Sequence, residues 1–507
     1  MIKRYFANKD NTITNAYQAD LVTRGTGSNM GQSDILEVFT IYGQVSSSAS
    51  GLQREKSRIL VQFDTAQILS DKNTGAISSG SAFYLKLYNA KHSQTLPRDF
   101  TLTIHNLNAD WQEGLGLDME NYSDLTYDIR GSNWIRRSGS TSWGTEGGGV
   151  GSVSYSTTFP IGNENLEVNV TSLVNQWLDS SEGSEENNGF LIRMDANLAA
   201  ENRSYYTKKF FARRSHNWFE RPVLEARWDS AKLDDRGSFY LSSSLAPPVD
   251  NLNTLYLYNY VRGRLTNIPS IGTATHGIMV SLFSGSANNS TLSGSALKLS
   301  ADGTYVSSTS QYVVTGGWVS TGIYSASFAY TGSSTIETIY DVWFSGSSAI
   351  VSATGSSLQF STGSTDIKRY AASLYTQTPS YVLSIPNRNQ EYYYNQTHRI
   401  RVYARERSWS PNIYDVATNI PNSLVFESSS YQIYRIMDNK VVIPYDTGSN
   451  QATRLSYDVS GNYFDLDASI LEPNYSYGVK FSIYDSDTLS YEEQPFVYKL
   501  RVVKNEY

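Results

Sequence analysis

Alternation of apolar and polar residues is the feature that most restricts how this chain can fold. Residues 83–88, FYLKLY, place Phe83, Leu85 and Leu87 on one side of an extended backbone. The same period of two recurs in residues 166–170, 399–405 and 479–484. Successive side chains of a β-strand point to opposite faces, so this pattern predicts strands with one buried face. Helical periodicity is nearly absent, and we expect an all-β protein.

One segment, residues 171–178, favours a short helix. Its apolar side chains are spaced by four, as Leu173 and Trp177 are, and so share a helical face. Thr171 or Ser172 can cap the first turn. Two turns are too short to be stable alone. We therefore expect this helix to cover one end of a sandwich with Trp177 and Leu173 buried, and total helix to stay well under a tenth of the chain.

Composition excludes several classes of function. The 507 residues amount to about 3.4 domains. Lys and Arg number 41 against 48 Asp and Glu, a net charge of −7, which disfavours nucleic-acid binding. The sequence has no cysteine, which rules out disulfides and thiolate metal sites. Its five histidines form no HExxH motif, and no G-x-S-x-G elbow occurs.

Composition also suggests where the chain divides. We expect an N-terminal extension over residues 1–24 and a first domain over 25–232, which ends in the polar stretch 229–237. A Ser/Gly-rich domain over 233–375 and a Tyr/Arg-rich domain over 376–507 follow. No internal repeat with a solenoid or propeller period is present.

No segment of the sequence suggests a membrane span or an export signal. A span requires about 18 or more consecutive apolar residues, and no stretch approaches that length. The basic start, residues 1–10, is not followed by an apolar core. These observations predict a protein that is assembled in the cytoplasm.

The first domain resembles a known family. It carries eight motifs in a fixed order, at residues 58–64, 81–87, 110–114, 132–134, 168–177, 189–192, 209–214 and 221–226. Four of them are RILVQFD (58–64), DWQEG (110–114), SNW (132–134) and GFLI (189–192). In this order they resemble the DNRLRE-type jelly-roll domain, which is related to carbohydrate-binding modules of bacterial surface and secreted proteins. The resemblance covers about two fifths of the chain and implies a jelly-roll sandwich.

A wider resemblance reaches both ends of the chain. Residues 4–16 and 25–37, together with 442–447 and 455–467, are similar to virion structural proteins of large tailed phages from marine and cyanobacterial hosts. That resemblance implies a β-sandwich protein of the neck, tail or head decoration. It also implies other virion proteins as partners and a homo-oligomeric ring or symmetric array.

Acidic residues cluster around Trp111. Asp110, Glu113, Asp118 and Glu120 could act as a carboxylate pair on a glycoside or bind a hard cation such as Ca²⁺. A solvated loop explains the same residues.

Asp465 and Asp467 flank Leu466 and so share one face of a predicted strand. Turn chemistry explains the presence of these two acids at least as well as a binding site does.

Two further stretches invite a binding interpretation. Residues 25–31, GTGSNMG, lack the Lys-Ser/Thr end of a P-loop, and we predict a turn or linker. Residues 208–214, KKFFARR, could follow a nucleic-acid backbone. Because they fall in a predicted strand of an acidic chain, we predict a domain-surface or subunit-contact role.

Aromatic residues give signals of fold rather than of catalysis. We expect Trp111, Trp134 and Trp177 in the core, because a two-sheet sandwich can bury such rings at its ends. Residues 471–477, LEPNYSY, resemble the tyrosine corner of immunoglobulin-like sandwiches, in which the phenol bonds to nearby backbone. Residues 322–330 suggest a similar arrangement.

The combined prediction is a jelly roll followed by two immunoglobulin-like sandwiches. We expect a non-enzymatic virion protein with no catalytic residue, cofactor or metal, acting through protein–protein contacts, with no nucleic acid and no membrane as partners. Residues 1–24 would dock by adding a strand to a neighbour's sheet. The alternative is a carbohydrate-binding adhesin that contacts a glycan of the host surface.

Overall fold

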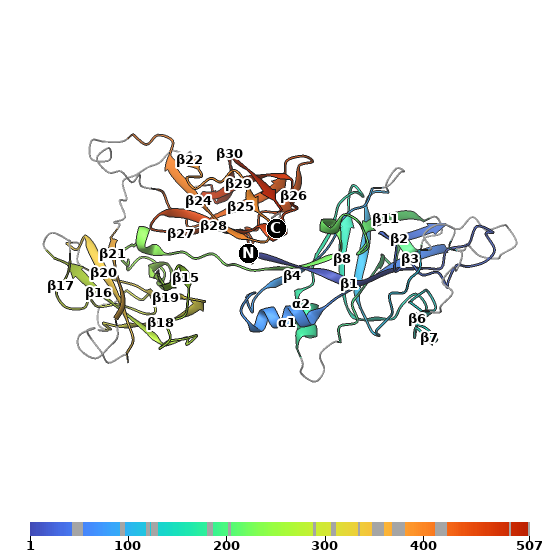
Figure 1. Ribbon diagram of the computed structural model, residues 1–507, viewed down its shortest axis with the longest axis horizontal. Helices are drawn as coiled ribbons and strands as arrows, with labels where there is room; N and C mark the ends of the chain where they lie inside the picture. Colours follow the sequence, from blue (N-terminus) through green and yellow to red (C-terminus); the bar gives the residue numbers. More distant parts are fainter. Residues whose placement is uncertain are drawn as a thin grey trace. The chain divides into compact units, whose positions relative to one another are not determined.

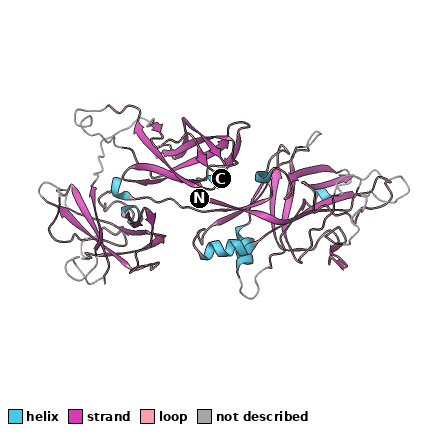
Figure 2. Cartoon of the chain, in the orientation of Figure 1, coloured by secondary structure: helices cyan, strands magenta, loops and turns pink. Residues whose placement is uncertain are grey.

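A computed structural model of the chain confirms that it is nearly all β, with 48% of residues in strands and 8% in helices (Figure 2). Two compact units, Met1–Trp228 and Asp229–Tyr507, divide it (Figure 1). The structure describes residues 1–42, 54–91, 97–117, 122, 130–179, 186–200, 204–286, 291–305, 311–332, 335–346, 359–367, 381–410, 423–485 and 488–504. Among these residues, no helix has the length and apolar character needed to cross a membrane.

Antiparallel strands and two short helices build the first unit. Their bounds are β1 Ile2–Thr14, β2 Ile35–Tyr42, β3 Arg54–Phe63, α1 Thr65–Asn73, β4 Ala82–Leu87, β5 Phe100–Leu107, β6 Arg136–Ser138, β7 Thr141–Ser142, β8 Val150–Phe159, β9 Leu166–Asn169, α2 Thr171–Leu178, β10 Phe190–Met194, β11 Tyr205–Phe211 and β12 Val223–Arg227. The main strand order is β8-β5-β10-β3-β1-β12-β4-β9, with β2 beside β3 and β11 beside β2.

Strand β1 joins the two halves of this sheet. Residues 2–6 pair with β12, and a register shift between Ala7 and Lys9 then turns the strand so that residues 9–14 pair with β3. Bulges of this kind re-aim a strand at the corner of a sandwich. The predicted extension over 1–24 is therefore wrong. Most of that segment is an interior strand, so it is not available to dock on a neighbour.

The principal core of the first unit lies on the faces predicted by the alternation. Phe83, Leu85 and Leu87, with Leu166 and Val168, are all buried in one cluster. The predicted alternations of the second unit also place their apolar members inside, namely Ile400, Val402, Ala404, Val479, Phe481 and Ile483. Period two therefore gave the correct inward face in each predicted strand.

Helix α2 occupies the predicted residues, and its buried face is the predicted one. Trp177 is 8% exposed, and its ring lies 4.8 Å from that of Phe190. The predicted cap is wrong, since Val170 is the N-cap and makes no side-chain bond. The Thr171 hydroxyl instead accepts the Phe83 amide (2.8 Å) and donates to Asn169, which ties the helix to strand β4.

A second helix, α1, was missed by the sequence analysis. It lies beside α2 (Figure 1). Its segment TAQILSDKN has no apolar stripe, and of its apolar residues only Ile68 is buried. The available signal was Asp64, whose carboxylate accepts the Ala66 amide as an N-cap (2.9 Å).

Three tryptophans form a smaller cluster separate from the principal core. Trp111, Trp134 and Trp143 pack on Ile13, Leu60, Leu107 and Leu191. Leu60 and Leu191 alternate with core residues of β3 and β10, so this cluster covers part of the outer face of the sheet. The predicted burial of Trp111 and Trp134 is confirmed.

Strands and short 3₁₀ turns make up the second unit. The first sheet contains β13 Asn253–Tyr258, β16 Ile278–Gly285, β17 Leu292–Ser293, β18 Val314–Ser320, β19 Ile323–Phe328, β20 Thr338–Phe344 and β21 Gln359–Asp366, and a hairpin joins β14 Tyr260–Val261 to β15 Arg264–Leu265. The main order of that sheet is β13-β19-β18-β16-β20-β21, with β17 beside β16. The expected boundary between residues 375 and 376 lies outside the described residues.

Two more sheets complete the second unit. One has the order β22-β24-β28-β27, and the other β23-β30-β29-β25-β26. Phe464 of the first sheet stacks on Tyr431 of the second at 4.3 Å, so the two pack face to face. Their strands are β22 Tyr381–Ser384, β23 Tyr392–Tyr393, β24 Thr397–Glu406, β25 Ser429–Arg435, β26 Lys440–Ile443, β27 Ser456–Asp458, β28 Gly461–Asp467, β29 Ser476–Asp485 and β30 Ser490–Val503.

The tyrosine of residues 471–477 makes the predicted local bond. The Tyr477 hydroxyl donates to the Glu472 carbonyl at 2.8 Å, and the ring is buried. In residues 322–330 the outcome differs, because the Tyr324 hydroxyl donates to Gly272, far upstream in the chain.

The polar stretch 229–237 is an ordered part of the second unit. Leu233 forms a parallel bridge with Tyr457, whose hydroxyl donates to Asp235 at 2.8 Å. Arg236 donates to Asp341 (2.6 Å) and to the Tyr256 carbonyl (2.6 Å). This stretch therefore bonds the sheet of β13 and β20 to the sheet of β27.

Candidate functional site

Each of the two described acidic residues around Trp111 is paired with a basic side chain. Asp110 accepts from Lys9 at 3.0 Å, and this lysine holds the pKa of Asp110 down against the opposing effect of burial. Glu113 is bonded through both oxygens by Arg213, at 2.6 and 2.8 Å. Asp118 and Glu120, which were part of the predicted cluster, lie outside the described residues.

Beside Glu113 lies a buried polar network that closes one end of the first unit. Asn11 donates to Ser132 and accepts the Met30 amide, while Asn29 donates to the carbonyls of Glu113 and Ser132 at 2.8 Å. The glycine-rich residues 25–31 therefore form a turn, as predicted, with Asn29 as its anchor. Within the described residues, no three His, Asp or Glu side chains are grouped so as to hold a metal.

The basic residues 208–214 differ in burial, and the first of them lies in the interior. Lys208 is fully buried, and its ammonium donates to Asn89 (2.6 Å) and to the Gly162 carbonyl (2.8 Å). Burial lowers the pKa of Lys208 to about 8. Lys209 pairs with Glu37, and Arg213 with Glu113. The predicted domain-surface role is wrong for Lys208, because its ammonium is buried and donates hydrogen bonds to neighbours inside the sandwich.

Asp465 and Asp467 also have structural roles. Asp465 accepts two bonds from Arg399, at 2.8 and 3.0 Å. Asp467 caps the 3₁₀ turn 468–470 by accepting the Ser469 amide. Turn chemistry is thus confirmed for Asp467.

One large cluster of charges in the first unit consists of ion pairs within the unit. Glu225 is 1% exposed and accepts from Arg4 (2.8 Å) and Arg227 (2.6 Å). Glu167 accepts from Arg227 (2.8 Å) and lies 3.4 Å from Lys86. Burial opposes ionisation of Glu225, but the cations outweigh it and hold its pKa far below the usual range.

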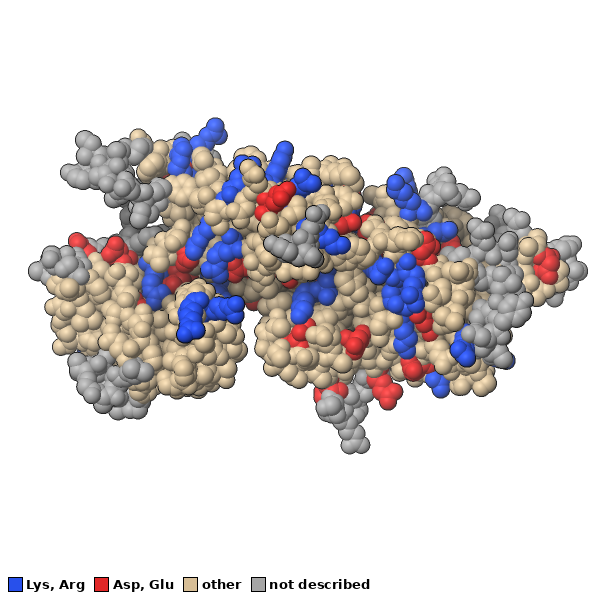
Figure 3. Space-filling model, viewed as in Figure 1, with Lys and Arg blue, Asp and Glu red and all other residues tan. Residues whose placement is uncertain are grey.

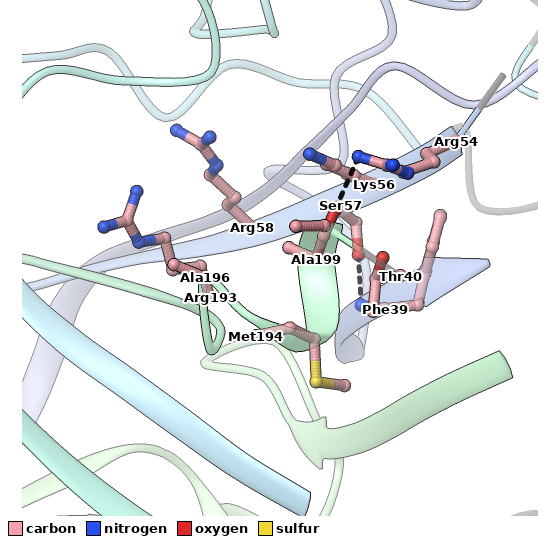
Figure 4. A pocket seen from close by; sticks show the side chains of 11 residues that line it. Phe39, Thr40, Arg54, Lys56, Ser57, Arg58, Arg193, Met194, Ala196 and Ala199 are labelled. Atoms are coloured by element: carbon pink, nitrogen blue, oxygen red, sulfur yellow. Dashed lines mark hydrogen bonds between the residues drawn. The ribbon is translucent and has the colours of Figure 1, made fainter. Parts of the chain in front are cut away.

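A second cluster of charges consists of four basic side chains around a cavity, and we call it the basic pocket. It is a cavity of about 200 Å³ in the first unit, with basic side chains from strands β3 and β10 (Figure 4). Those side chains are Arg54, Lys56, Arg58 and Arg193; the remaining lining residues are Phe39, Thr40, Ser57, Met194, Ala196, Ala199 and Ala200.

Strand geometry explains why these cations meet. Arg54, Lys56 and Arg58 are every second residue of β3 and so share a face. Arg193 follows core residue Ile192 on β10, as Arg58 precedes core residue Ile59 on β3. The four side chains therefore stand on the outer face, next to the tryptophan cluster.

Loops around the basic pocket fix part of its wall. Arg58 donates to the Gly147 carbonyl at 2.6 Å and lies over the Trp134 ring at 4.9 Å. Gly147 has a φ of +79°, and a Cβ there would lie 2.9 Å from both Arg58 and Trp134, so this approach requires glycine. Arg54 donates to the Ala199 carbonyl at 3.4 Å.

Burial and mutual repulsion lower the pKa values of three basic side chains in the pocket, Lys56, Arg58 and Arg193. Burial and the nearby Arg193 lower the pKa of Arg58 to about 10. The pKa of Lys56 is lowered by burial and by three neighbouring cations, Arg54, Arg58 and Arg193. Burial also lowers the pKa of Arg193, and Asp195 opposes this. Neighbouring like charges that lower each other's pKa are often found at functional sites.

Beyond Arg193 the outer face becomes rich in hydroxyls. Thr103 of β5 lies opposite Arg193 on one side and Ser156 of β8 on the other. Ser154, Ser156 and Thr158 alternate on the exposed face of β8. His105, two residues from Thr103, has its pKa lowered to about 4 by burial and by Arg193 and Arg58, so it stays neutral.

Several buried polar atoms at this site have no hydrogen-bond partner among the residues that the structure describes. They are Thr40 Oγ1 and Arg193 Nε in the basic pocket, with Thr103 Oγ1 and His105 Nε2 beside it. Buried polar atoms are normally paired, so each such atom calls for an explanation. The sequence analysis did not identify this site, although the spacing of Arg54, Lys56 and Arg58 was a usable signal.

Comparisons with known proteins leave the family open. No family model matches the chain, and no curated protein does. Solved structures with some likeness include a marsupial T cell receptor (10% identity, 50% of this chain and 70% of that one, TM-score 0.16) and DIP-gamma IG1+IG2 (11%, 51% and 91%, 0.13). Another is native E. coli alpha-2-macroglobulin (8% identity, 90% of this chain and 23% of that one, TM-score 0.15). Scores this low support no conclusion on fold or function.

Proposed function

We propose that this protein is a non-enzymatic structural component of a tailed-phage virion, in the neck, tail or head decoration, and that it acts through protein–protein contacts. It would be a jelly roll followed by two immunoglobulin-like sandwiches. The sequence resemblance at both ends of the chain suggests this role. The bond from Tyr477 to Glu472 supports the immunoglobulin-like assignment, because that bond defines a tyrosine corner.

The observation that supports a structural role is that the side chains considered for chemistry form bonds within the protein. Asp110 and Glu113, which the sequence analysis considered for catalysis, and Lys208, which it considered for nucleic-acid binding, are engaged in internal bonds. Large uncharged areas dominate the face in Figure 3, in keeping with a charged fraction of only 18%. Surfaces depleted in charge suit extensive protein contacts.

The decisive experiment is quantitative mass spectrometry of purified particles from the source phage. We expect the protein in a fixed copy number that matches a symmetry of the particle, as a ring or array requires. Its absence from particles would refute the virion role. The expected docking by residues 1–24 cannot be tested by deleting them, because the deletion would also remove strand β1 from the sheet.

Catalysis has its own test. We expect no release of reducing ends from host polysaccharide by the purified chain. Release that is lost in both Asp110→Asn and Glu113→Gln would show that the protein is a glycosidase, provided that both variants melt as the parent does.

A second function, carbohydrate binding, is favoured by one observation. The exposed hydroxyls of Ser154, Ser156 and Thr158 form an open polar face on β8, and such a face can hydrogen-bond sugars. A glycan array probed with the full chain tests this function. Failure to bind any glycan would exclude it.

A further inference from the structure

We propose that Lys208 and Asn89 of the first unit react with each other and form an isopeptide bond. In this reaction Nζ of the lysine becomes bonded to Cγ of the asparagine, and ammonia is released. The cross-link would join strand β11 to the segment that follows β4, between residues that are 119 apart in the sequence. The inference goes beyond both proposed functions and depends on neither of them.

The first argument is the place of Lys208 in the core. Lys208 and Phe210 are the two buried residues of β11, two apart, and so share its inner face. In the register of the sheet Lys208 lies opposite Val38, a member of the principal core. Its Nζ is 5.1 Å from the ring centre of Phe159 and 5.3 Å from that of Phe210. Lysine is almost never fully buried without a partner, so this position calls for a specific explanation.

The second argument is the distance between the reacting atoms. Nζ of Lys208 donates to Oδ1 of Asn89 at 2.6 Å. Because a C=O bond is about 1.23 Å long, Nζ then lies no more than about 3.8 Å from Cγ. Reacting atoms held within roughly 3–3.5 Å are in position for attack, and a small rotation of the lysine closes the difference. Nζ also donates to the Gly162 carbonyl at 2.8 Å, which keeps the amine in place as it turns.

The third argument is the rigidity of the surrounding backbone. Asn89 forms an antiparallel bridge with Phe210, and two backbone bonds of 3.0 Å join residues 88–90 to residues 209–211 on either side of it. The Asn89 amide also donates to the Asn165 side chain at 2.9 Å. In an antiparallel pair, diagonal neighbours on one face are within reach of a long side chain. The sheet therefore holds the lysine and the asparagine together.

The loop that contains Gly162 is fixed as well. Both carboxylate oxygens of Glu164 accept backbone amides at 2.7 Å, one from Ile161 and one from Gly162. Glu164 is thus a positioning residue, since it orients the loop whose carbonyl holds the amine of Lys208.

The fourth argument is the protonation state, because only a neutral amine is a nucleophile. Burial lowers the pKa of Lys208 to about 8, although the charge of Glu164 acts in the opposite direction. At pH 7 a pKa of about 8 leaves roughly a tenth of the amines neutral, whereas a solvated lysine leaves fewer than about one in a thousand. Desolvation among apolar side chains is a known way to activate a lysine.

The reaction is balanced without any further reactant. The lone pair of Nζ attacks Cγ, and the electrons of the C=O double bond move to Oδ1. When that double bond forms again, the bond from Cγ to Nδ2 breaks. The proton that Nζ loses is taken up by Nδ2, which leaves as ammonia, and no water, oxidant or reductant is consumed. Asn89 is half-buried, so the ammonia has a path to solvent.

Mass spectrometry of the full chain tests the proposal. After incubation at about pH 9, where most of the Lys208 amines are neutral, we expect the denatured protein to be lighter than its sequence by one ammonia. Trypsin does not cleave after an acylated lysine, so it should release a branched peptide that joins residues 87–91 to residues 204–209. An unchanged mass, with these peptides released separately, would refute the cross-link.

Two variants place the bond. Lys208→Arg keeps the charge but removes the amine, and it should show neither the loss of ammonia nor the branched peptide. Lys209→Arg, at the next position of the strand, is the matched control and should retain both. An equal loss of ammonia from Lys208→Arg would show that it comes from another asparagine and would refute the proposal. A branched peptide that begins at residue 209 would refute the assignment to Lys208.

Discussion

Replacing Glu225 by Gln should destabilise the first unit severely. The substitution keeps the shape of the side chain but removes the carboxylate that Arg4 and Arg227 bond at 2.8 and 2.6 Å, at a site that is 1% exposed. Glu167 then remains as the one carboxylate opposite three cations, and it is itself 34% exposed. Removing one partner of a buried ion pair costs about 3–5 kcal/mol, and we expect a loss in that range.

Equilibrium urea unfolding of the full chain measures this loss, with hydrogen exchange of peptides from residues 1–228 used to separate the first unit. Glu146→Gln, at an exposed site, is the control and should change stability by less than about 0.5 kcal/mol. A loss below about 1 kcal/mol for Glu225→Gln would mean that the cluster behaves like a surface ion pair, which would refute the reasoning. Adding Arg4→Met to Glu225→Gln should restore part of the loss, because it removes an uncompensated cation.

Further predictions concern single contacts. Trp177→Ala should cost about 3–5 kcal/mol in urea unfolding, because the ring packs on Phe190, and an unchanged midpoint would contradict its burial. Tyr477→Phe should cost about 0.5–1.5 kcal/mol through the lost bond to Glu472, and no change would show that water replaces it. The low pKa of Lys208, about 8, means that the unfolded chain binds more protons above that pH. In chains that lack the cross-link, the contribution of Lys208 to stability should therefore rise from pH 8 toward the lysine value of about 10.4, so the stability of the parent relative to Lys208→Met should increase over that range.

Local patterns carried the part of the fold that the sequence could predict. Period-two alternation identified the inward faces of β4 and β24, and spacing by four identified helix α2, because both signals depend on neighbouring residues alone. The Tyr477 bond spans only five residues and was equally accessible. Strand β1 was missed because its partners, β3 and β12, are distant in the sequence.

The candidate site shows the same division. Lys208 looked like a surface residue, because its hydrogen-bond acceptors, Asn89 and Gly162, are distant in the sequence. The basic pocket was partly visible in the spacing of Arg54, Lys56 and Arg58. Its fourth cation, Arg193, reaches the pocket only through the pairing of β10 with β3.

The double pairing of β1 also sets the order of events during folding. Ile2 lies opposite Arg227, so the first half of β1 has no partner until the last strand of the unit has been synthesised. Its second half can pair with β3 much earlier. Until β12 has been synthesised and has paired, the edges of β1 and β4 that face it have unpaired backbone groups. Unpaired edges of this kind can lead to aggregation or strand exchange in nascent β proteins. Slow closure of this seam, rather than the stability of the finished sandwich, would then determine how much of the protein reaches its native form.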